Sequence, residues 1–379
     1  MKKLFTILLS LALLLAAAGC SGASSSAAPA PASSEVPASS EEPAPAEEGL
    51  AGKRVMLALN ALGDLSFNDL FYQGLMAIKD THNVEANYAE VGTDISTYEG
   101  YFFDFTDEGY DYVFLRPGFL DLCKANAADY PEMKFIVYDT TPLDECEVPN
   151  VYLQASTTYQ AAYLVGMAAA GTTQTGVIGF VGGQENPLIY DFLTGYIQGA
   201  TAVNPDIKVS SAFIGNYNDT AKAVELATAQ ISNNNADVIF AACGGASLGV
   251  FQTCLEKGVY AIGCDSDQYT IYNQKGETDL ASVIMTSCLK KIDKSLEAIM
   301  NRVAAGEDVF AEVQAGRLGL ADGAVGVADN ENYQKIVPEE IRNQIADAEK
   351  KIISGEIEVK SAYYMTQAEI DSLIASVTP

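Results

Sequence analysis

Residues 55–69 read VMLALNALGDLSFND, and this stretch decides how the rest of the chain is interpreted. An apolar run typical of a buried strand passes into a short polar turn, and apolar residues at helical spacing begin directly after it. In open parallel α/β sheets, ligands bind at such a turn, outside the carboxyl end of a strand. The turn offers amide, carboxylate and hydroxyl groups and an aromatic ring. We therefore expect a site for a small ligand with a flat face and several hydroxyl groups.

Apolar strands and amphipathic helices keep alternating to about residue 305, which predicts an α/β fold with parallel sheets and helices on both sheet faces. The strands are too many for one sheet, and the pattern restarts after Asn150. We therefore expect two doubly wound, Rossmann-like lobes with a ligand cleft between them. The predicted strands span residues 53–60, 84–90, 110–115, 134–139, 150–154, 175–181, 207–214, 236–241, 258–263 and 280–286. The predicted helices span residues 67–81, 94–107, 119–130, 158–171, 187–203, 218–233, 246–257 and 288–305.

The two lobes are expected to exchange segments. The predicted division gives lobe one residues 50–155 plus about 287–315, and lobe two residues 156–286 plus about 316–379. The chain would then cross between the lobes near residues 154–158, 284–289 and 312–326.

The beginning of the chain indicates export. Residues 1–19 combine a basic start with an apolar stretch too short to span a bilayer comfortably, and small residues lead up to Cys20. This arrangement resembles the bacterial lipoprotein signal, in which the cysteine becomes the lipid-modified N-terminus on the outer side of the membrane. An ordinary signal peptide with an incidental cysteine is the alternative. Residues 20–49 are rich in Ser, Ala, Pro and Glu and are expected to form a disordered linker.

Composition excludes several classes of partner. A net charge of -28, with 22 Lys and Arg against 50 Asp and Glu, argues against binding to nucleic acid or to anionic lipid surfaces. One histidine, His82, and the lack of any CxxC spacing argue against a metal site. The six cysteines after Cys20 are expected to be buried free thiols, with disulfide pairing as the alternative. We expect a monomer without a cofactor.

Catalysis is not expected. The chain lacks the GxSxG, HExxH and GxxxxGK[ST] signatures, and the glycine-rich turn at residues 179–183 does not have GxGxxG spacing. A single histidine also removes the commonest general base.

The polar residues of the first turn fall into two groups. Ser66 and Asp69 have the spacing of a capping box at the start of the helix, with Asp in place of the usual Glu. Asn60, Asp64 and Asn68 are not explained by capping and are expected to point into the cleft. Phe67, the first residue of the predicted helix, is either a core residue or a ring offered to the ligand.

The DLSFN motif at residues 64–68, followed by Gly74, resembles the DxSFN…G signature of the basic membrane protein family, the PnrA-like purine nucleoside receptors. The resemblance continues over more than half of the chain in the same order. Its further elements are the strand KFIVYD at 134–139, the turn GFVGG at 179–183, YND at 217–219, the glycines around Gly244, and IGCDSDQ at 262–268 with Lys290 after it. Membership would imply a type I periplasmic-binding-protein fold that delivers a nucleoside to an ABC permease and its ATPase.

The resemblance also implies roles for individual residues in holding a base. The base would lie between the rings of Phe67 and Tyr217, because offset aromatic contacts favour a flat purine. Asn68 and Asp139 would form hydrogen bonds with the base edge. An N-cap role for Asp139 is the alternative.

For the sugar, the resemblance implies that Asp265 and Lys290 bind the ribose hydroxyls, with backbone amides around Gly244 helping. The alternatives are a turn role for Asp265 and an exposed helical position for Lys290. Asp267 is the weaker of the two nearby aspartates and is expected to stabilise its turn.

Two departures from the family pattern concern specificity. Asn60 stands where the family commonly has an aspartate, and an amide both donates and accepts hydrogen bonds whereas a carboxylate only accepts. Arg116 stands where a small or apolar residue is expected, and it either faces the cleft or points outward. A sugar-binding protein of the same fold and a surface nucleoside sensor without a transport role are the alternative functions.

Overall fold

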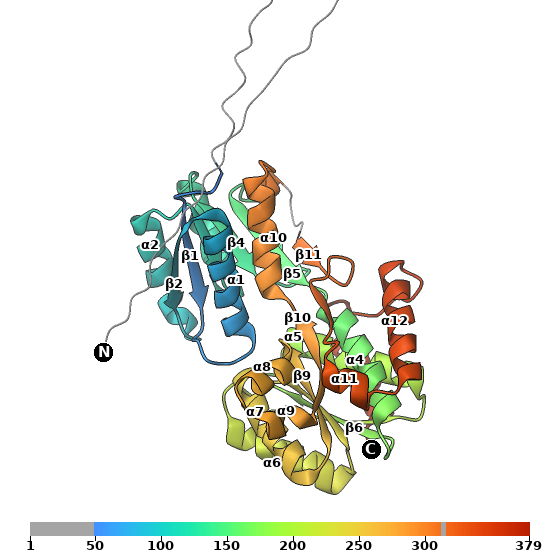
Figure 1. The fold of residues 1–379 in the computed structure, drawn as a ribbon. Helices are drawn as coiled ribbons and strands as arrows, with labels where there is room; N and C mark the ends of the chain where they lie inside the picture. Colours follow the sequence, from blue (N-terminus) through green and yellow to red (C-terminus); the bar gives the residue numbers. More distant parts are fainter. Residues whose placement is uncertain (1–48, 312–315) are drawn as a thin grey trace, which may run out of the picture. The chain divides into compact units, whose positions relative to one another are not determined.

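The computed structural model describes residues 49–311 and 316–379 (Figure 1). The predicted signal peptide, Cys20 and nearly all of the predicted linker lie outside the described residues.

Two six-stranded sheets organise the described chain. All strand pairs are parallel except the antiparallel pair of β10 and β12. In spatial order, the first sheet contains β11 (Gly316–Leu318), β5 (Val151–Ser156), β4 (Lys134–Tyr138), β3 (Tyr112–Leu115), β1 (Arg54–Leu59) and β2 (Glu85–Glu90). The second contains β12 (Val325–Val327), β10 (Ile284–Lys290), β9 (Tyr260–Asp265), β8 (Val238–Ala242), β6 (Val177–Gly182) and β7 (Lys208–Phe213).

Helices cover both faces of each sheet, as the apolar strands require. Alternate residues of β1 enter different cores. Leu57 packs in the cluster beneath α1 (Phe67–His82) and α10 (Ile292–Ala304). Met56 packs on the opposite face, in the cluster beneath the two helices that follow α1 along the chain. Those two helices are α2 (Tyr98–Glu108) and α3 (Leu120–Asn126).

The second sheet is covered in the same way. The helices on one face are α4 (Thr158–Thr172), α5 (Pro187–Val203) and α12 (Glu339–Ile353), and those on the other are α6 (Thr220–Asn234), α7 (Ser247–Lys257) and α9 (Thr278–Val283). The remaining helices are α8 (Gln268–Gln274), α11 (Glu331–Ile336) and α13 (Gln367–Val377). We call each sheet with its helices a lobe.

The predicted α/β class and the two doubly wound lobes are confirmed. Each predicted strand has a counterpart in the structure, but the last one begins at Ile284 rather than at 280, because residues 278–283 form α9. No element was predicted beyond residue 305, where the structure has two short strands and three helices.

The chain passes between the two sheets three times within the described residues. It does so between β5 and α4, at Lys291 between β10 and α10, and between β11 and β12. β10 extends to Lys290, so the second passage follows the strand instead of falling within residues 284–289. The exact lobe boundaries stay a prediction.

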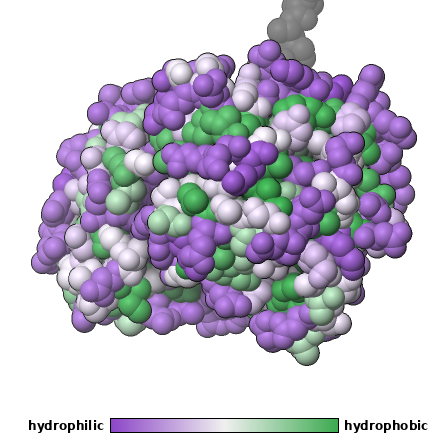
Figure 2. Space-filling view, turned by 90° about the horizontal axis from the view of Figure 1, so that it is seen from below, coloured by the Kyte–Doolittle hydropathy of each residue, from purple (hydrophilic) through white to green (hydrophobic). Residues whose placement is uncertain are grey.

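The six cysteines in the described chain are free and buried, which confirms the free-thiol interpretation. The face seen in Figure 2 is mostly hydrophilic, with hydrophobic residues in small groups between polar ones.

Candidate functional site

The turn between β1 and α1 is built around Asp64. Its carboxylate accepts hydrogen bonds from the backbone amides of Ser66 at 3.0 Å, Asn68 at 3.0 Å and Asp69 at 3.2 Å. Asp64 therefore satisfies free amides at the start of the helix, so the prediction that capping does not explain Asp64 is wrong. The predicted capping box is wrong, because the Ser66 hydroxyl makes no cap hydrogen bond and Asp69 accepts from amides earlier in the turn.

The side chain of Asn68 connects two parts of this turn by hydrogen bonds. Its Nδ2 donates to Asp64 at 2.8 Å, and its Oδ1 accepts the backbone amide of Asn60 at 3.0 Å. Asn60 Oδ1 is buried without a hydrogen-bond partner among the described residues, as is the hydroxyl oxygen of Thr140 after β4. Buried acceptors without a donor are costly, so both atoms are candidates for ligand contacts. Thr140 was not among the predicted site residues.

A buried ion pair joins the two sheets. Lys290, at the end of β10, is 2% exposed and binds the carboxylate of Asp139, which directly follows β4. Asp139 has a φ of 57°, a left-handed conformation uncommon for a residue other than glycine. The burial of Lys290 excludes the exposed helical position, and Asp139 is not an N-cap, because the next element after β4 is the strand β5. An ion pair out of water persists only when each charge is well partnered.

The electrostatics of Lys290 depend on two aspartates. Burial by itself lowers the pKa of Lys290, but Asp139 and Asp265 together outweigh it, so the pKa is raised. Burial raises the pKa of Asp265, against the opposing effects of Lys290 and of a hydrogen bond from Ser66. The amine therefore stays charged.

The ring of Phe67 lies beside this pair. Its centre is 4.8 Å from Lys290 Nζ, a cation–π distance, and 4.8 Å from the ring centre of Phe71 in an edge-on contact. Phe67 is half-buried and packs on the core of the first lobe. Both interpretations of Phe67 therefore apply, because the ring contacts the core and also the charged groups.

Tyr217, in the second lobe, lies near enough to Asp139 and Lys290 for both charges to act on its hydroxyl. Its hydroxyl accepts a hydrogen bond from Asn186 Nδ2 at 3.1 Å, and burial raises its pKa. A Cβ on Gly183 would lie 2.3 Å from the Tyr217 ring, and one on Gly244 would lie 3.3 Å from the Tyr217 Cβ. Glycine is therefore required at Gly183 for the ring to lie where it does. The GFVGG motif at residues 179–183 is part of the family resemblance, which did not connect it with Tyr217.

Asp265 and Ser66 form a contact that sequence reasoning missed. Ser66 Oγ donates to Asp265 Oδ2 at 2.7 Å, although the two residues lie in different lobes. A serine in a turn gives no sign of so distant a partner.

The other polar residues considered from sequence have local partners. Arg116 donates to the carbonyl of Gly92 at 3.4 Å. Asp267 caps α8 and accepts from the amide and hydroxyl of Thr270, which confirms its turn role.

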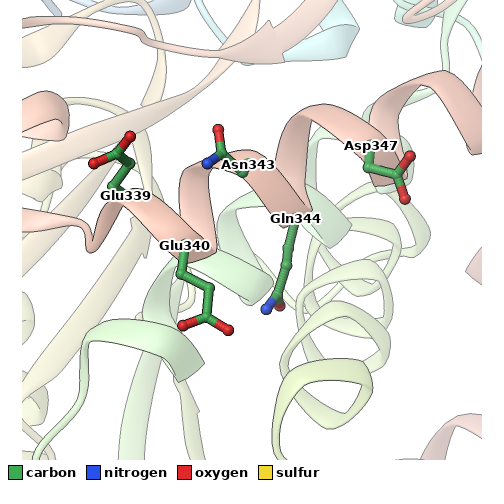
Figure 3. Close-up of a pocket in the computed structure, with 5 residues that line it drawn as sticks. All are labelled: Glu339, Glu340, Asn343, Gln344 and Asp347. Carbon is green, nitrogen blue, oxygen red and sulfur yellow. The ribbon is translucent and has the colours of Figure 1, made fainter.

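Two hollows accompany these features. One of about 270 Å³ is lined by residues of both lobes, including Leu65, Ser66, Ser266 and Lys275. The larger hollow, of about 610 Å³, lies along α12, and all the residues that line it belong to this helix (Figure 3). The larger hollow contains none of the predicted site residues, so size is a poor guide to the site here. Its residues are Glu339, Glu340, Asn343, Gln344 and Asp347.

Within the described chain, no group of three or more His, Cys, Asp or Glu side chains is placed to hold a metal ion. In the same residues, no helix combines the length and apolar character needed to cross a membrane.

The solved structures most useful for comparison share the fold. A solute-binding protein of an ABC transporter system from Aeropyrum pernix K1 aligns with a TM-score of 0.72 at 21% identity, covering 86% of this chain and 98% of that one. A solute-binding protein from Conexibacter woesei aligns with a TM-score of 0.66 at 18% identity, covering 82% and 99%.

Sequence comparison gives the family. Basic membrane protein A2 of Borrelia garinii subsp. bavariensis is 31% identical over 303 residues, 78% of this chain and 84% of that protein. The ABC transporter nucleoside-binding protein BmpA of Lactococcus lactis subsp. cremoris is 28% identical, over 80% and 87%. The family model described as "ABC transporter substrate-binding protein PnrA-like" matches residues 52–362. The chain therefore belongs to the Bmp family of PnrA-like substrate-binding proteins of ABC transporters.

Proposed function

We propose that this protein binds purine nucleosides, such as adenosine, guanosine or inosine, for uptake. The observation that carries the proposal is the buried Lys290–Asp139 pair beside the Phe67 ring, since it places charges suited to hydroxyl and N–H groups next to an aromatic surface. The name of the Lactococcus lactis relative supports the same ligand class.

In this proposal the base stacks between Phe67 and Tyr217. Asp139 accepts from the base edge through the carboxylate oxygen that Lys290 leaves free, and Asn68 contributes to the same edge. Asn60 Oδ1, buried without a partner among the described residues, accepts a further ligand donor. Because Asn60 also carries an amide donor, this position distinguishes ligands by their donor and acceptor pattern.

The ribose is bound by charged groups at the ends of β9 and β10. Asp265 accepts from the vicinal hydroxyls, a common means of ribose recognition. Lys290 donates to a hydroxyl while keeping its contact with Asp139. Backbone amides at Gly244 complete this part of the site. Asp64 fixes the turn that carries Phe67, and its ligand contact stays a prediction.

The role of a substrate-binding protein implies an ABC permease and its ATPase as partners and a place outside the cytoplasm. We further propose a monomer held on the outer face of the cell membrane through a lipid on Cys20, a residue outside the described part. Transfer of a lipid label to the wild-type chain but not to Cys20→Ser in the producing bacterium tests the anchor.

A thermal-shift screen tests the ligand. Protein refolded once from denaturant, to remove carried-over ligand, is heated with adenosine, guanosine, inosine, uridine, cytidine, free bases, ribose or glucose. We expect a rise of several degrees with purine nucleosides, because a ligand at a hundred times its Kd adds about 2.7 kcal/mol to the free energy of unfolding.

Four variants, one of them a control, sharpen this test. Phe67→Ala and Asp139→Asn are expected to lose the purine response, while Tyr88→Ala, which removes a 43% exposed ring of β2, keeps it. Asn60→Asp is expected to change the order of preference among the bases. A rise with sugars alone would favour the sugar-binding alternative, and no rise with any compound would contradict nucleoside binding.

A further inference from the structure

The start of α1 is hydrogen-bonded to the second lobe at several points. Ser66 Oγ donates to Asp265 Oδ2 at 2.7 Å. The carbonyl of Leu65 accepts from Ser266 Oγ at 3.1 Å and from Gln268 Nε2 at 2.8 Å. The side chain of Leu65 also packs on a hydrophobic cluster whose buried members all belong to the second lobe. Polar and apolar contacts therefore join the lobes at one place.

The first-lobe side of this contact is held rigidly. Leu65 has a φ of 53°, a strained conformation for a residue with a side chain. The carboxylates of the same turn maintain it: Asp69 accepts the Leu65 amide at 2.9 Å, and Asp64 accepts the Ser66 amide at 3.0 Å. In this backbone conformation the Leu65 carbonyl points toward the second lobe, where it accepts its two hydrogen bonds.

The second-lobe side is equally constrained. Gln268 is buried at the start of α8, and its amide donates to Ser287 Oγ at 3.1 Å. Asp265, at the end of β9, has a φ of 65°. Each side of the contact is therefore constrained by its own lobe.

On its first-lobe side, the contact lies away from the first passage between the lobes. In the first sheet, β1, which precedes it, is three strand spacings from β5, where the first passage begins, a separation of about 14 Å. In the second sheet, β9, which leads to Asp265, pairs with β10, and the second passage follows β10. A rotation of the lobes that moves the end of β1 away from the second lobe would therefore break this contact.

We propose that Leu65, Ser66, Ser266 and Gln268 form a latch that holds the lobes together without ligand and positions Asp265. None of these four residues has a predicted ligand role. The latch would favour the closed arrangement in the free protein, so ligand affinity would depend on residues that do not touch the ligand.

Small-angle X-ray scattering of the ligand-free protein tests the latch. Ser66→Ala removes the hydroxyl donor to Asp265, and Gln268→Met removes the donor to Leu65 at similar side-chain length. We expect a larger radius of gyration for each, from a roughly three- to tenfold shift of the closed–open equilibrium, and the largest for the double variant. Ser66→Thr keeps a hydroxyl and is expected to stay near the wild-type value.

Ser210→Ala is the matched control, because Ser210 is a buried serine whose hydroxyl binds Asn234 within the second lobe. Urea unfolding of every variant identifies any that is merely destabilised. An unchanged radius of gyration in folded Ser66→Ala and Gln268→Met would overturn the latch, and so would an equal expansion in Ser210→Ala. The measurement uses no ligand, so its outcome is independent of the nucleoside proposal.

Discussion

Lys290 shows how strongly one residue depends on its surroundings. Its side chain is almost completely removed from water, and its charge is retained because two carboxylates are near it. Removal of the amine would leave Asp139 and Asp265 as buried carboxylates without a counter-charge.

Lys290→Met is therefore expected to lower the free energy of unfolding by about 3–5 kcal/mol in urea titrations. The double variant with Asp139→Asn is expected to regain part of this loss, because only Asp265 then remains a buried carboxylate without the cation. Lys294→Met, which removes a 61% exposed amine, is the control and is expected to change stability by less than about 1 kcal/mol. Equal losses in the single and double variants would contradict the pairing.

The family motif drew attention to residues that the structure places close together, while spacing in the sequence missed partners that are distant along the chain. The motif drew attention to Lys290, but periodicity did not indicate its burial. Ser66 had the right spacing for a capping box, yet its hydroxyl binds Asp265, 199 positions along the chain. Local spacing carries no information about such contacts.

At the scale of elements, the close packing of α4 on α5 depends on missing side chains. A Cβ on Gly199 of α5 would lie 1.8 Å from the carbonyl oxygen of Tyr163 in α4. We expect Gly199→Ala to lower stability by about 1–3 kcal/mol through overpacking. Gly100→Ala in α2, where nothing lies within 4 Å, is expected to raise stability by about 0.5–1 kcal/mol. Equal effects, measured by urea unfolding, would show that helix propensity alone is responsible.

Asp191 of α5 joins this helix to the C-terminal segment. Its carboxylate accepts from Ser361 Oγ at 2.6 Å, from the Ala362 amide at 2.9 Å and from Thr158 Oγ1 at 3.1 Å. Burial nevertheless raises the pKa of Asp191 to about 6. Between about pH 4 and 6 the folded protein therefore holds a proton that the unfolded chain has lost.

The stability contributed by Asp191 is thus greatest below pH 4 and is lost as the pH rises through about 6. As the pH rises from 4 to 7, we expect the free energy of unfolding of the wild type to fall by about 2–3 kcal/mol more than that of Asp191→Asn, which has no carboxyl group to titrate. Urea unfolding at each pH measures this difference. Asp121→Asn, at an exposed position of α3, is the control. A difference that does not vary with pH would contradict the raised pKa.

At the scale of the whole molecule, the net charge of -28 acts against compactness. Raising the NaCl concentration from about 0.01 M to 0.1 M shortens the screening length from about 30 Å to about 10 Å. We therefore expect the Tm to rise over this range, because repulsion between acidic groups is screened. KCl is expected to act equally, and a Tm that falls in both salts would contradict this account.

The sequence by itself determined the two doubly wound lobes, the succession of strands along the chain up to residue 286, and the turn at residues 60–69. Apolar periodicity and strand–helix alternation are local properties, so a reader of the sequence has direct access to them. Only the tertiary structure decided that Asp139 pairs with Lys290, that Ser66 reaches Asp265 and that Asn60 leaves a buried oxygen without a partner in the described chain. These features arise where ends of strands from two sheets meet, and the packing of distant segments sets that meeting.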